Sequence, residues 1–147
     1  MTRKYLPTIA DLIDRLSISL MKSIFIDKGV YSAEANMIKS DLEVLLRGAV
    51  WTQASPSQLI YDVLVLMLAN RYIWENEGDI RTTPMTEGKP DGYKDIALRL
   101  IATHSINGVR TRAKNEINRI FGERCDVKTD CLAANLPPQM GNWRVFD

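Results

Sequence analysis

The chain has 147 residues, of which 46% are hydrophobic and 25% are charged, and its formal net charge is +1. This composition is typical of a single soluble globular domain with one hydrophobic core. It argues against a disordered chain, a collagen-like repeat, a disulfide scaffold and a polybasic nucleic-acid-binding protein.

The sequence contains no pattern typical of a membrane span or a secretion signal. The longest apolar block, residues 63–69, is much shorter than the roughly 20 residues that cross a bilayer. Near the start of the chain, Asp11 and Asp14 interrupt the apolar stretch that a signal peptide would need. We therefore expect a cytoplasmic protein without a membrane partner.

The cysteines and the histidine do not form a usual metal-binding motif. Cys125 and Cys131 are separated by five residues, which is not a common zinc spacing, and His104 is the only histidine. Two free thiols in a reducing compartment are the simpler interpretation. We therefore expect no metal site and no cofactor.

Hydrophobic periodicity predicts four helices, and capping residues predict where the first two begin. Thr8 and Asp11 form a short capping box, Gly29 is suited to a left-handed residue after the first helix, and Ser32 is the expected N-cap of the second. The first helix carries one apolar stripe, made of Ile9, Leu12, Ile13, Leu16, Leu20 and Ile24. The four helices are expected over about residues 8–27, 33–48, 56–77 and 93–121.

The third helix has the clearest start signal in the chain. Ser55, Pro56 and Gln58 supply an N-cap, a first-turn proline and a capping-box residue, and Gly78 can end the helix. Between these limits, apolar side chains occur almost all the way round the helix. A helix that is apolar on every side is typically buried, so we expect it to be the central element of the fold.

Two segments lack helical periodicity. Residues 79–92 contain two prolines and two glycines and are expected to form a loop. Residues 122–147 are expected to form an irregular tail, whose Trp143 and Phe146 dock on the body or on another subunit. The predicted fold is therefore all-α: a four-helix bundle-like single domain over residues 1–147 with an irregular C-terminal tail.

The fourth helix carries the candidate site. Its apolar side changes near residues 105–108, which predicts a kink or break at Gly108. The row that starts with Ile96 and Leu100 continues onto polar residues at steps of three and four, and Arg110 lies beside it. A seam that changes from apolar to polar can hold a ligand groove between helices. The polar members of the row are His104, Asn107, Thr111, Lys114 and Asn118.

The charge distribution favours an anionic ligand for this helix. From Lys94 to Arg124 there are seven basic and three acidic residues, whereas residues 1–92 contain ten basic and twelve acidic residues. Such a local excess creates a positive field on a nearly neutral chain. Arginine and lysine bind phosphate and carboxylate groups, and asparagine can recognise amides and hydroxyls.

Two segments resemble a family of small uncharacterised helical proteins from bacteria and their phages. That family has an opening of the form T-I-x-[DE]-L-I-D-[RK]-L-S-I and a later helix with an Asn-x-x-Arg core. Here residues 8–18 read TIADLIDRLSI, and Asn107 and Arg110 supply the later motif. The resemblance covers about 20 of 147 residues. It implies that Asp14 and Arg15 meet Asn107 and Arg110 in one place.

We therefore predict a non-enzymatic protein that holds a small anionic ligand, such as a nucleotide or a sugar phosphate, in a polar groove between helices. A homo-oligomer is expected, and a phage version of such a protein could sequester a host defence signal. The alternative interpretation of the polar row is a solvated helix face. The candidate ligand-binding residues are Asp14, Arg15, His104, Asn107, Arg110, Thr111, Lys114 and Asn118.

Two other functions stay open at this stage. A magnesium-dependent all-α nucleotide pyrophosphohydrolase needs a carboxylate cluster, for which Asp62, Glu75, Glu77 and Asp79 are the candidates. Asp62 has a simpler interpretation, as a buried acid paired with a base from the fourth helix. A protein-interaction module would use the C-terminal tail. No G-x-S-x-G or Gly-rich phosphate loop occurs, and no aromatic residues alternate with the basic ones, which argues against nucleophilic catalysis and nucleic-acid binding.

Overall fold

The computed structural model describes residues 6–52, 55–82 and 90–127. Over these residues the chain forms four helices and no strand, so the all-α prediction is confirmed. Residues 128–147, which include Trp143 and Phe146, lie outside the described residues. The helices are α1 (Ile9–Phe25), α2 (Lys28–Gly48), α3 (Pro56–Thr82) and α4 (Pro90–Ile120).

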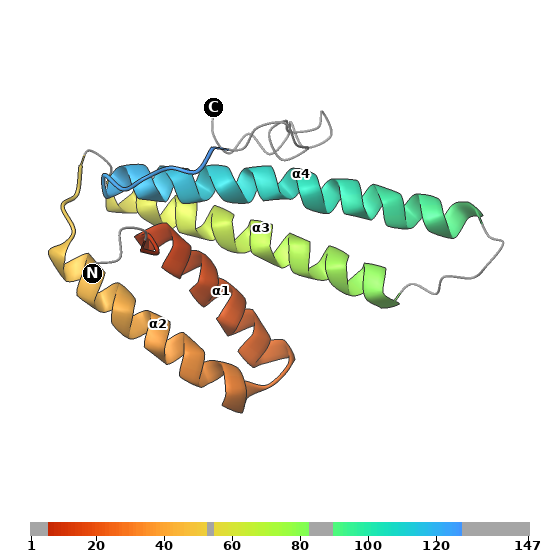
Figure 1. Ribbon diagram of the computed structural model, residues 1–147, viewed down its shortest axis with the longest axis horizontal. Helices are drawn as coiled ribbons and strands as arrows, with labels where there is room; N and C mark the ends of the chain where they lie inside the picture. The colour runs from red at the N-terminus through yellow and green to blue at the C-terminus, as the bar shows by residue number, and fades with distance from the viewer. Residues whose placement is uncertain (1–5, 53–54, 83–89, 128–147) are drawn as a thin grey trace.

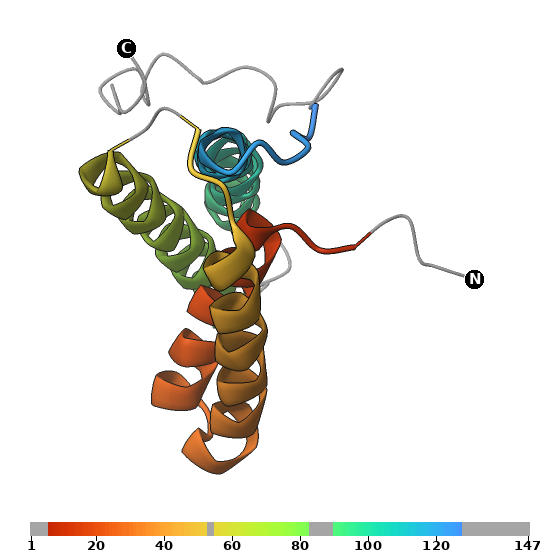
Figure 2. The ribbon, with the colours of Figure 1, turned by 90° about the vertical axis from the view of Figure 1, so that its left-hand side faces the viewer.

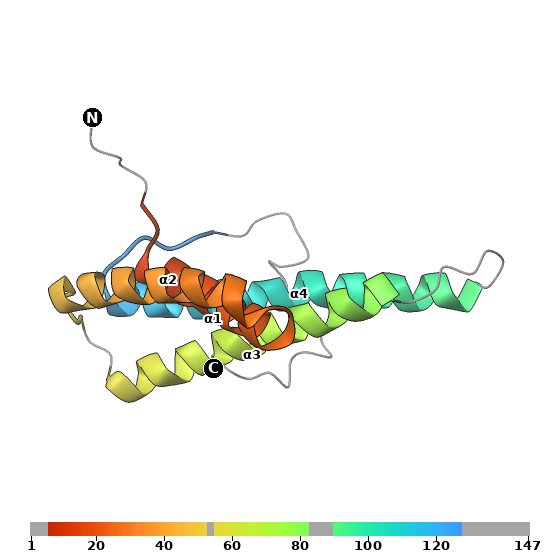
Figure 3. The ribbon, with the colours of Figure 1, turned by 90° about the horizontal axis from the view of Figure 1, so that it is seen from below.

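The helices are arranged as two antiparallel hairpins. Helices α3 and α4 run side by side over most of their length, and the α1–α2 hairpin lies across one half of that pair (Figures 1 and 3). Helix α1 packs against all three other helices, whereas α2 packs against α1 and, within the described residues, against no other helix. The expectation that the third helix is the central element is therefore wrong: α1 joins the two hairpins.

The start of α1 follows the sequence prediction, but the start of α2 does not. Thr8 and Asp11 form the expected capping box, in which each side chain accepts a hydrogen bond from the other residue's backbone N–H. Helix α2 begins five residues earlier than the Ser32 cap implied, because Asp27 accepts hydrogen bonds from the N–H groups of Gly29 and Val30. Gly29 is consequently part of the first turn of α2, and Gly122 is the described glycine that adopts a positive φ.

Helices α3 and α4 are both longer than expected. Helix α3 continues to Thr82 and α4 begins at Pro90, so every residue of the predicted loop 79–92 is either helical or lies outside the described residues. Helix α4 is one uninterrupted element through Gly108, and the predicted break there is absent. The change in its apolar side has another cause: residues 103–121 pack against α1 and α3, while the earlier turns pack along the distal half of α3 (Figure 1).

The hydrophobic core lies where α1 crosses the α3–α4 pair. Its most deeply buried large side chains are Leu66 of α3 and Ile106, Val109 and Ile117 of α4. The apolar stripe predicted for α1 is only partly in the core: its first turns pack there, but Leu20 and Ile24 are exposed. The core therefore stabilises one half of the molecule, and the distal ends of both hairpins project beyond it.

Candidate functional site

The candidate site is centred on an ion pair between α1 and α4. Asp14 and Arg110 are 96 residues apart in the chain, yet Arg110 Nε and Nη2 donate to the two carboxylate oxygens of Asp14 at 2.9 and 2.5 Å. The Asp14 side chain is 9% exposed and that of Arg110 is 29% exposed. This forked geometry is the strongest form of arginine–carboxylate contact.

Two further polar side chains complete the environment of Asp14. Asn70, from the buried side of α3, donates to Asp14 Oδ1 and to the Ser17 hydroxyl, both at 2.8 Å. Ser17 donates in turn to the backbone carbonyl of Asp14. Asn107 reaches Arg110 Nη1 through its Oδ1 at 3.4 Å. Side chains from α1, α3 and α4 therefore form one hydrogen-bonded network around the carboxylate.

A second ionic cluster lies one turn earlier on α1. Lys114 contacts Asp11 at 2.7 Å and Asp126 at 3.7 Å, and Arg124 contacts Asp11 at 3.1 Å. Burial by itself would raise the pKa of Asp11, but hydrogen bonds from Lys114 and Thr8 outweigh it and hold the pKa below its ordinary value. Together, Asp11, Asp14, Arg110 and Lys114 form what we term the α1/α4 seam.

Residues 122–127 return along α4 and close one end of the seam. Asn118 donates to the backbone carbonyl of Arg124, and Asn115 both donates to and accepts from the backbone of Asp126. Glu123 accepts a hydrogen bond from the N–H of Ile9 at 2.7 Å, at the first turn of α1. The predicted ligand residue Asn118 therefore holds this segment, and its side chain is almost completely buried.

The remaining predicted site residues lie outside the network. Arg15 points toward α2, where it contacts Glu34 at 2.6 Å, and hydrogen bonds from Arg15 and Ser19 lower the pKa of Glu34. His104 is exposed, and Thr111 is half-buried beside Arg110 along the helix. The structure thus brings Asp14, Asn107 and Arg110 together, as the family resemblance implied, and places Arg15 elsewhere.

The positive field expected along α4 is neutralised by nearby carboxylates. Four cations of α4, and Arg124 just beyond the helix, each contact an acid, and three of these contacts reach α1. Asn70, Ser17 and Asp11 are the partners that sequence reasoning missed. A polar residue such as Asn70 on an otherwise apolar, buried side of a helix was the available signal, because buried polar groups need hydrogen-bond partners. The paired cations are Arg99, Arg110, Lys114, Arg119 and Arg124.

The carboxylates considered for magnesium do not converge. Glu75, Glu77 and Asp79 are exposed and contact Arg71, Arg81 and Arg99, respectively. In the described part of the chain, no group of three or more side chains is arranged to hold a metal ion.

Asp62 is fully buried on the core side of α3, where one of its oxygens accepts a hydrogen bond from Gln58 and the other has no partner among the described residues. The expected base from α4 is therefore absent. Burial, only partly offset by the hydrogen bond from Gln58 and reinforced by repulsion from Glu116, raises the pKa of Asp62.

A different surface stands out on the side of α3 that faces away from α4. Five large apolar side chains recur there at steps of three and four residues, with exposed fractions between 42% and 61%. We term this set the outward face of α3. Figure 2 shows that none of the other helices covers this side of the first half of α3. The five residues are Ile60, Tyr61, Leu64, Met67 and Leu68.

The outward face of α3 continues toward the end of α1. One turn beyond Met67, Arg71 lies on the same side of α3, and its guanidinium stacks on the ring of Phe25 at 4.5 Å. Arg71 also contacts Glu75, which is on the next turn. Phe25 and its neighbours Ile24 and Ile26 are themselves more than half exposed.

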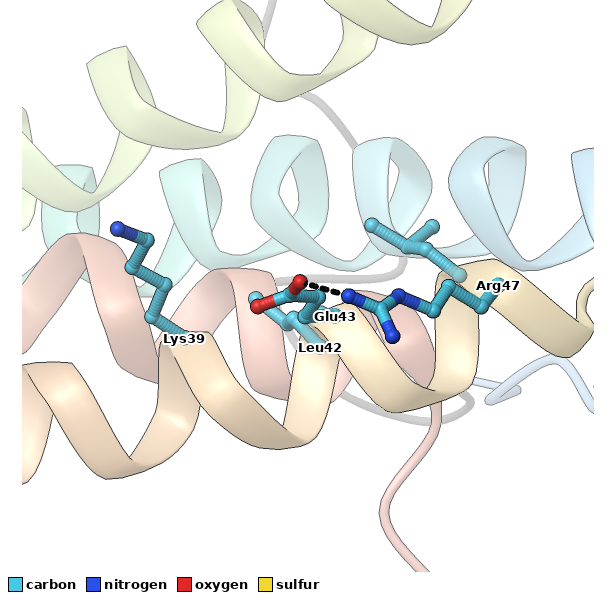
Figure 4. A pocket seen from close by; sticks show the side chains of 5 residues that line it. Lys39, Leu42, Glu43 and Arg47 are labelled. Atoms are coloured by element: carbon cyan, nitrogen blue, oxygen red, sulfur yellow. Dashed lines mark hydrogen bonds and ion pairs between the residues drawn. The ribbon is translucent and has the colours of Figure 1, made fainter.

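A shallow groove of about 510 Å³ lies along the outer side of α2 (Figure 4). Lys39 stands apart at one end of it, while Glu43 and Arg47 form an ion pair at the other (Figure 4). All five lining residues belong to α2, so no second element encloses a ligand there. The lining residues are Lys39, Leu42, Glu43, Leu46 and Arg47.

Comparisons with protein-family models, with curated proteins and with solved structures give no match to this chain. Among the described helices, none is both long and apolar enough to cross a bilayer. The function is therefore argued from the α1/α4 seam and the outward face of α3.

Proposed function

We propose that this chain is a non-enzymatic binding protein, and that it binds protein through the outward face of α3. The observation that carries this proposal is the uncovered apolar stripe on a helix that is apolar on both sides. Monomeric soluble proteins rarely expose contiguous apolar patches larger than a few hundred Å², and larger patches commonly mark interaction sites.

The polar groups favour the same conclusion. Asp14 and Arg110 of the seam are bound to each other and to uncharged partners from α1, α3 and α4. A catalytic centre needs reactive groups that converge on a substrate, with pKa values shifted for the task. The pKa of Asp62 is raised, but this residue is buried on the core side of α3 and hydrogen-bonded to Gln58, so it does not face a substrate site.

Labelling of thiols in intact cells that express the protein tests the proposal. The variant Leu64→Cys places a thiol on the outward face, and Val44→Cys places a control thiol at the more exposed position 44 of α2. Both are made with Cys125 and Cys131 changed to serine, so that only the new thiol reacts. We expect alkylation at position 64 to be at least about 10-fold slower than at position 44, because a protein contact blocks access. Equal rates at the two positions would overturn the proposal.

A second candidate function is binding of a small anionic ligand at the seam. It is favoured by one detail: Arg110 uses Nε and Nη2 for Asp14, whereas its Nη1 makes only the 3.4 Å contact with Asn107. The sequestering role suggested by the phage-family resemblance belongs to this candidate.

Thermal unfolding against a panel of cyclic and linear nucleotides and sugar phosphates tests this second candidate. A ligand at about 100 times its Kd stabilises the folded chain by about 2.7 kcal/mol, which gives a clear increase in Tm. The matching unphosphorylated nucleosides are the control, because they lack the anionic group. No increase in Tm with any phosphate-bearing member would remove the candidate.

A further inference from the structure

We infer that the partner of the outward face of α3 is the same face of a second copy of this chain, so that two α3 helices pack together across a two-fold axis. This inference rests on the proposed function, since it names the protein that the face binds. It is carried by the spacing of the face, its lack of charge, its size and its position relative to the rest of the molecule.

The spacing of the face is that of a helix-packing seam. Ile60, Leu64 and Met67 are separated by four and three residues, and Leu68 widens the stripe on one side. Side chains at these intervals form the ridges that interlock when two helices pack. An extended peptide would be expected to use pockets at other intervals, so a helix is the matching partner.

The face is also free of charge, which permits it to meet itself. Between residues 55 and 70 the only charged side chain is Asp62, and it is fully buried on the opposite side. The centres of protein interfaces are depleted in charged residues. In a two-fold contact every residue meets the same surface of its partner, so a charge near the axis would meet a like charge. No such repulsion arises here.

The size of the face is close to what a small dimer needs. Five large side chains that are about half exposed form a patch on the order of 500 Å², near the upper end of what single chains display. Two such patches together bury about 1,000 Å², the lower limit for a specific interface. Phe25 and Arg71 extend the patch at one end, and the Arg71–Glu75 pair supplies a polar rim.

The competing partner for the face is the chain's own C-terminal segment. The described residues end at Val127, which follows the segment bound to Asn115 and Asn118. Residues 122–127 lie on one side of α4 and α3 lies on the other (Figures 2 and 3). The chain beyond residue 127 therefore starts on the far side of α4 from the outward face, whereas a second copy can approach that face directly.

The test is the mass of the full chain in solution, measured by light scattering after size-exclusion chromatography. At about 100 μM we expect twice the chain mass of 16.7 kDa, falling toward 16.7 kDa on dilution to about 1 μM. Leu64→Glu should be monomeric with unchanged helical circular dichroism, because Leu64 is already 53% exposed in the single chain. Val44→Glu is the matched control, since it adds the same charge on α2, and it should remain dimeric.

A double variant, Trp143→Ala with Phe146→Ala, separates the two possible partners. We expect it to remain dimeric, whereas dissociation would assign the contact to the C-terminal segment and overturn the inference. A monomeric wild type at about 100 μM, or a dimeric Leu64→Glu, would overturn it as well.

The labelling experiment distinguishes this failure from failure of the proposed function. Protection of position 64 that persists in concentrated pure protein and is lost on dilution supports self-association. Protection seen only in cells supports a different protein partner and overturns the second copy. No protection under any condition overturns the binding function itself.

Discussion

The α1/α4 seam and the outward face of α3 are both unusual surfaces, but they differ in what satisfies them. At the seam, charged groups from distant parts of the chain pair with one another: Asp14 with Arg110, and Asp11 with Lys114. On the outward face of α3, five apolar side chains lie uncovered by any other helix. The charged groups of the seam find partners within one chain, whereas no described helix covers the outward face.

This difference shows why a residue's chemistry does not by itself locate a binding site. The cations of α4 suggested an anion site, but neighbouring carboxylates bind four of them. The apolar residues of α3 suggested a buried core, but only one side of the helix lies in the core. We therefore expect changes at the seam to alter the stability of the single chain, and changes on the outward face to alter association.

The largest expected effect contrasts two leucines on opposite sides of α3. Leu66 is fully buried, so Leu66→Ala should lower the free energy of unfolding by about 4 kcal/mol through lost contacts and a cavity. Leu64 is 53% exposed, so Leu64→Ala should cost less than about 0.5 kcal/mol in the single chain. Urea unfolding at low micromolar concentration measures both. Equal costs for the two variants would show that the outward face is covered within the single chain.

The next effect concerns the seam. Asp14→Ala should lower the free energy of unfolding by about 3 kcal/mol, because it leaves Arg110 and Asn70 without their shared acceptor. Arg15→Ala is the control: it removes the neighbouring and more exposed pair with Glu34, and it should cost less than about 1 kcal/mol. Urea unfolding of both variants decides this, and similar costs would contradict the view that the network around Asp14 stabilises the crossing of α1 and α4.

A smaller difference in stability is expected between variants of the N-caps of α1 and α3. Thr8→Ala removes the side chain that accepts from the N–H of Asp11, and it should cost about 1 kcal/mol. Ser55→Ala removes the corresponding 3.3 Å bond to the N–H of Gln58 at the exposed start of α3, and it should cost about 0.5 kcal/mol. Thermal unfolding ranks the two. A greater loss for Ser55→Ala would mean that the start of α3 is more strongly held than its exposure indicates.

The smallest effect is a dependence of stability on pH. It originates at Asp62, which lies on the side of α3 opposite the outward face. Because the pKa of Asp62 is raised above 3.8 in the folded chain, the folded state holds its proton more tightly than the unfolded state does. Stability contributed by the protonated form is therefore lost as the pH rises from about 4 through the folded pKa. Asp62→Asn removes this loss but introduces a buried amide donor in place of the unpartnered oxygen.

We accordingly expect Asp62→Asn to be more stable than the wild type at pH 7 by less than about 1 kcal/mol. The difference should shrink as the pH falls toward 4. Urea unfolding at several pH values measures it. A difference that does not change with pH would show that folding does not raise the pKa of Asp62.

The sequence was sufficient to predict the helices but not how they pack. The capping box of Thr8 and Asp11 is a local pattern, so the start of α1 is correct. The start of α2 was missed because Asp27 and Ser32 are both good caps, and the earlier one allows an additional turn to form. Periodicity revealed that α3 is apolar on two sides, but it does not distinguish a core from an interface.

The candidate site was predictable only in part. The resemblance in two short segments implied that Asp14, Asn107 and Arg110 meet in one place. In the structure, Arg110 contacts both Asp14 and Asn107. Asn70 could not be assigned to the network, because its role depends on how α3 crosses α1, which no local pattern records. For the same reason, the pairing of Arg110 was invisible in the sequence, because its acid, Asp14, lies 96 residues away in the chain.

The contact between Glu123 and Ile9 has a consequence for how the protein forms during synthesis. The first turn of α1 is completed by a side chain 114 positions later in the chain, and Arg124 adds a bond to the carbonyl of Leu6. A ribosome that adds about 5–20 residues per second therefore exposes α1 for several seconds before this partner emerges. A segment that is made late in synthesis therefore secures the start of the first helix.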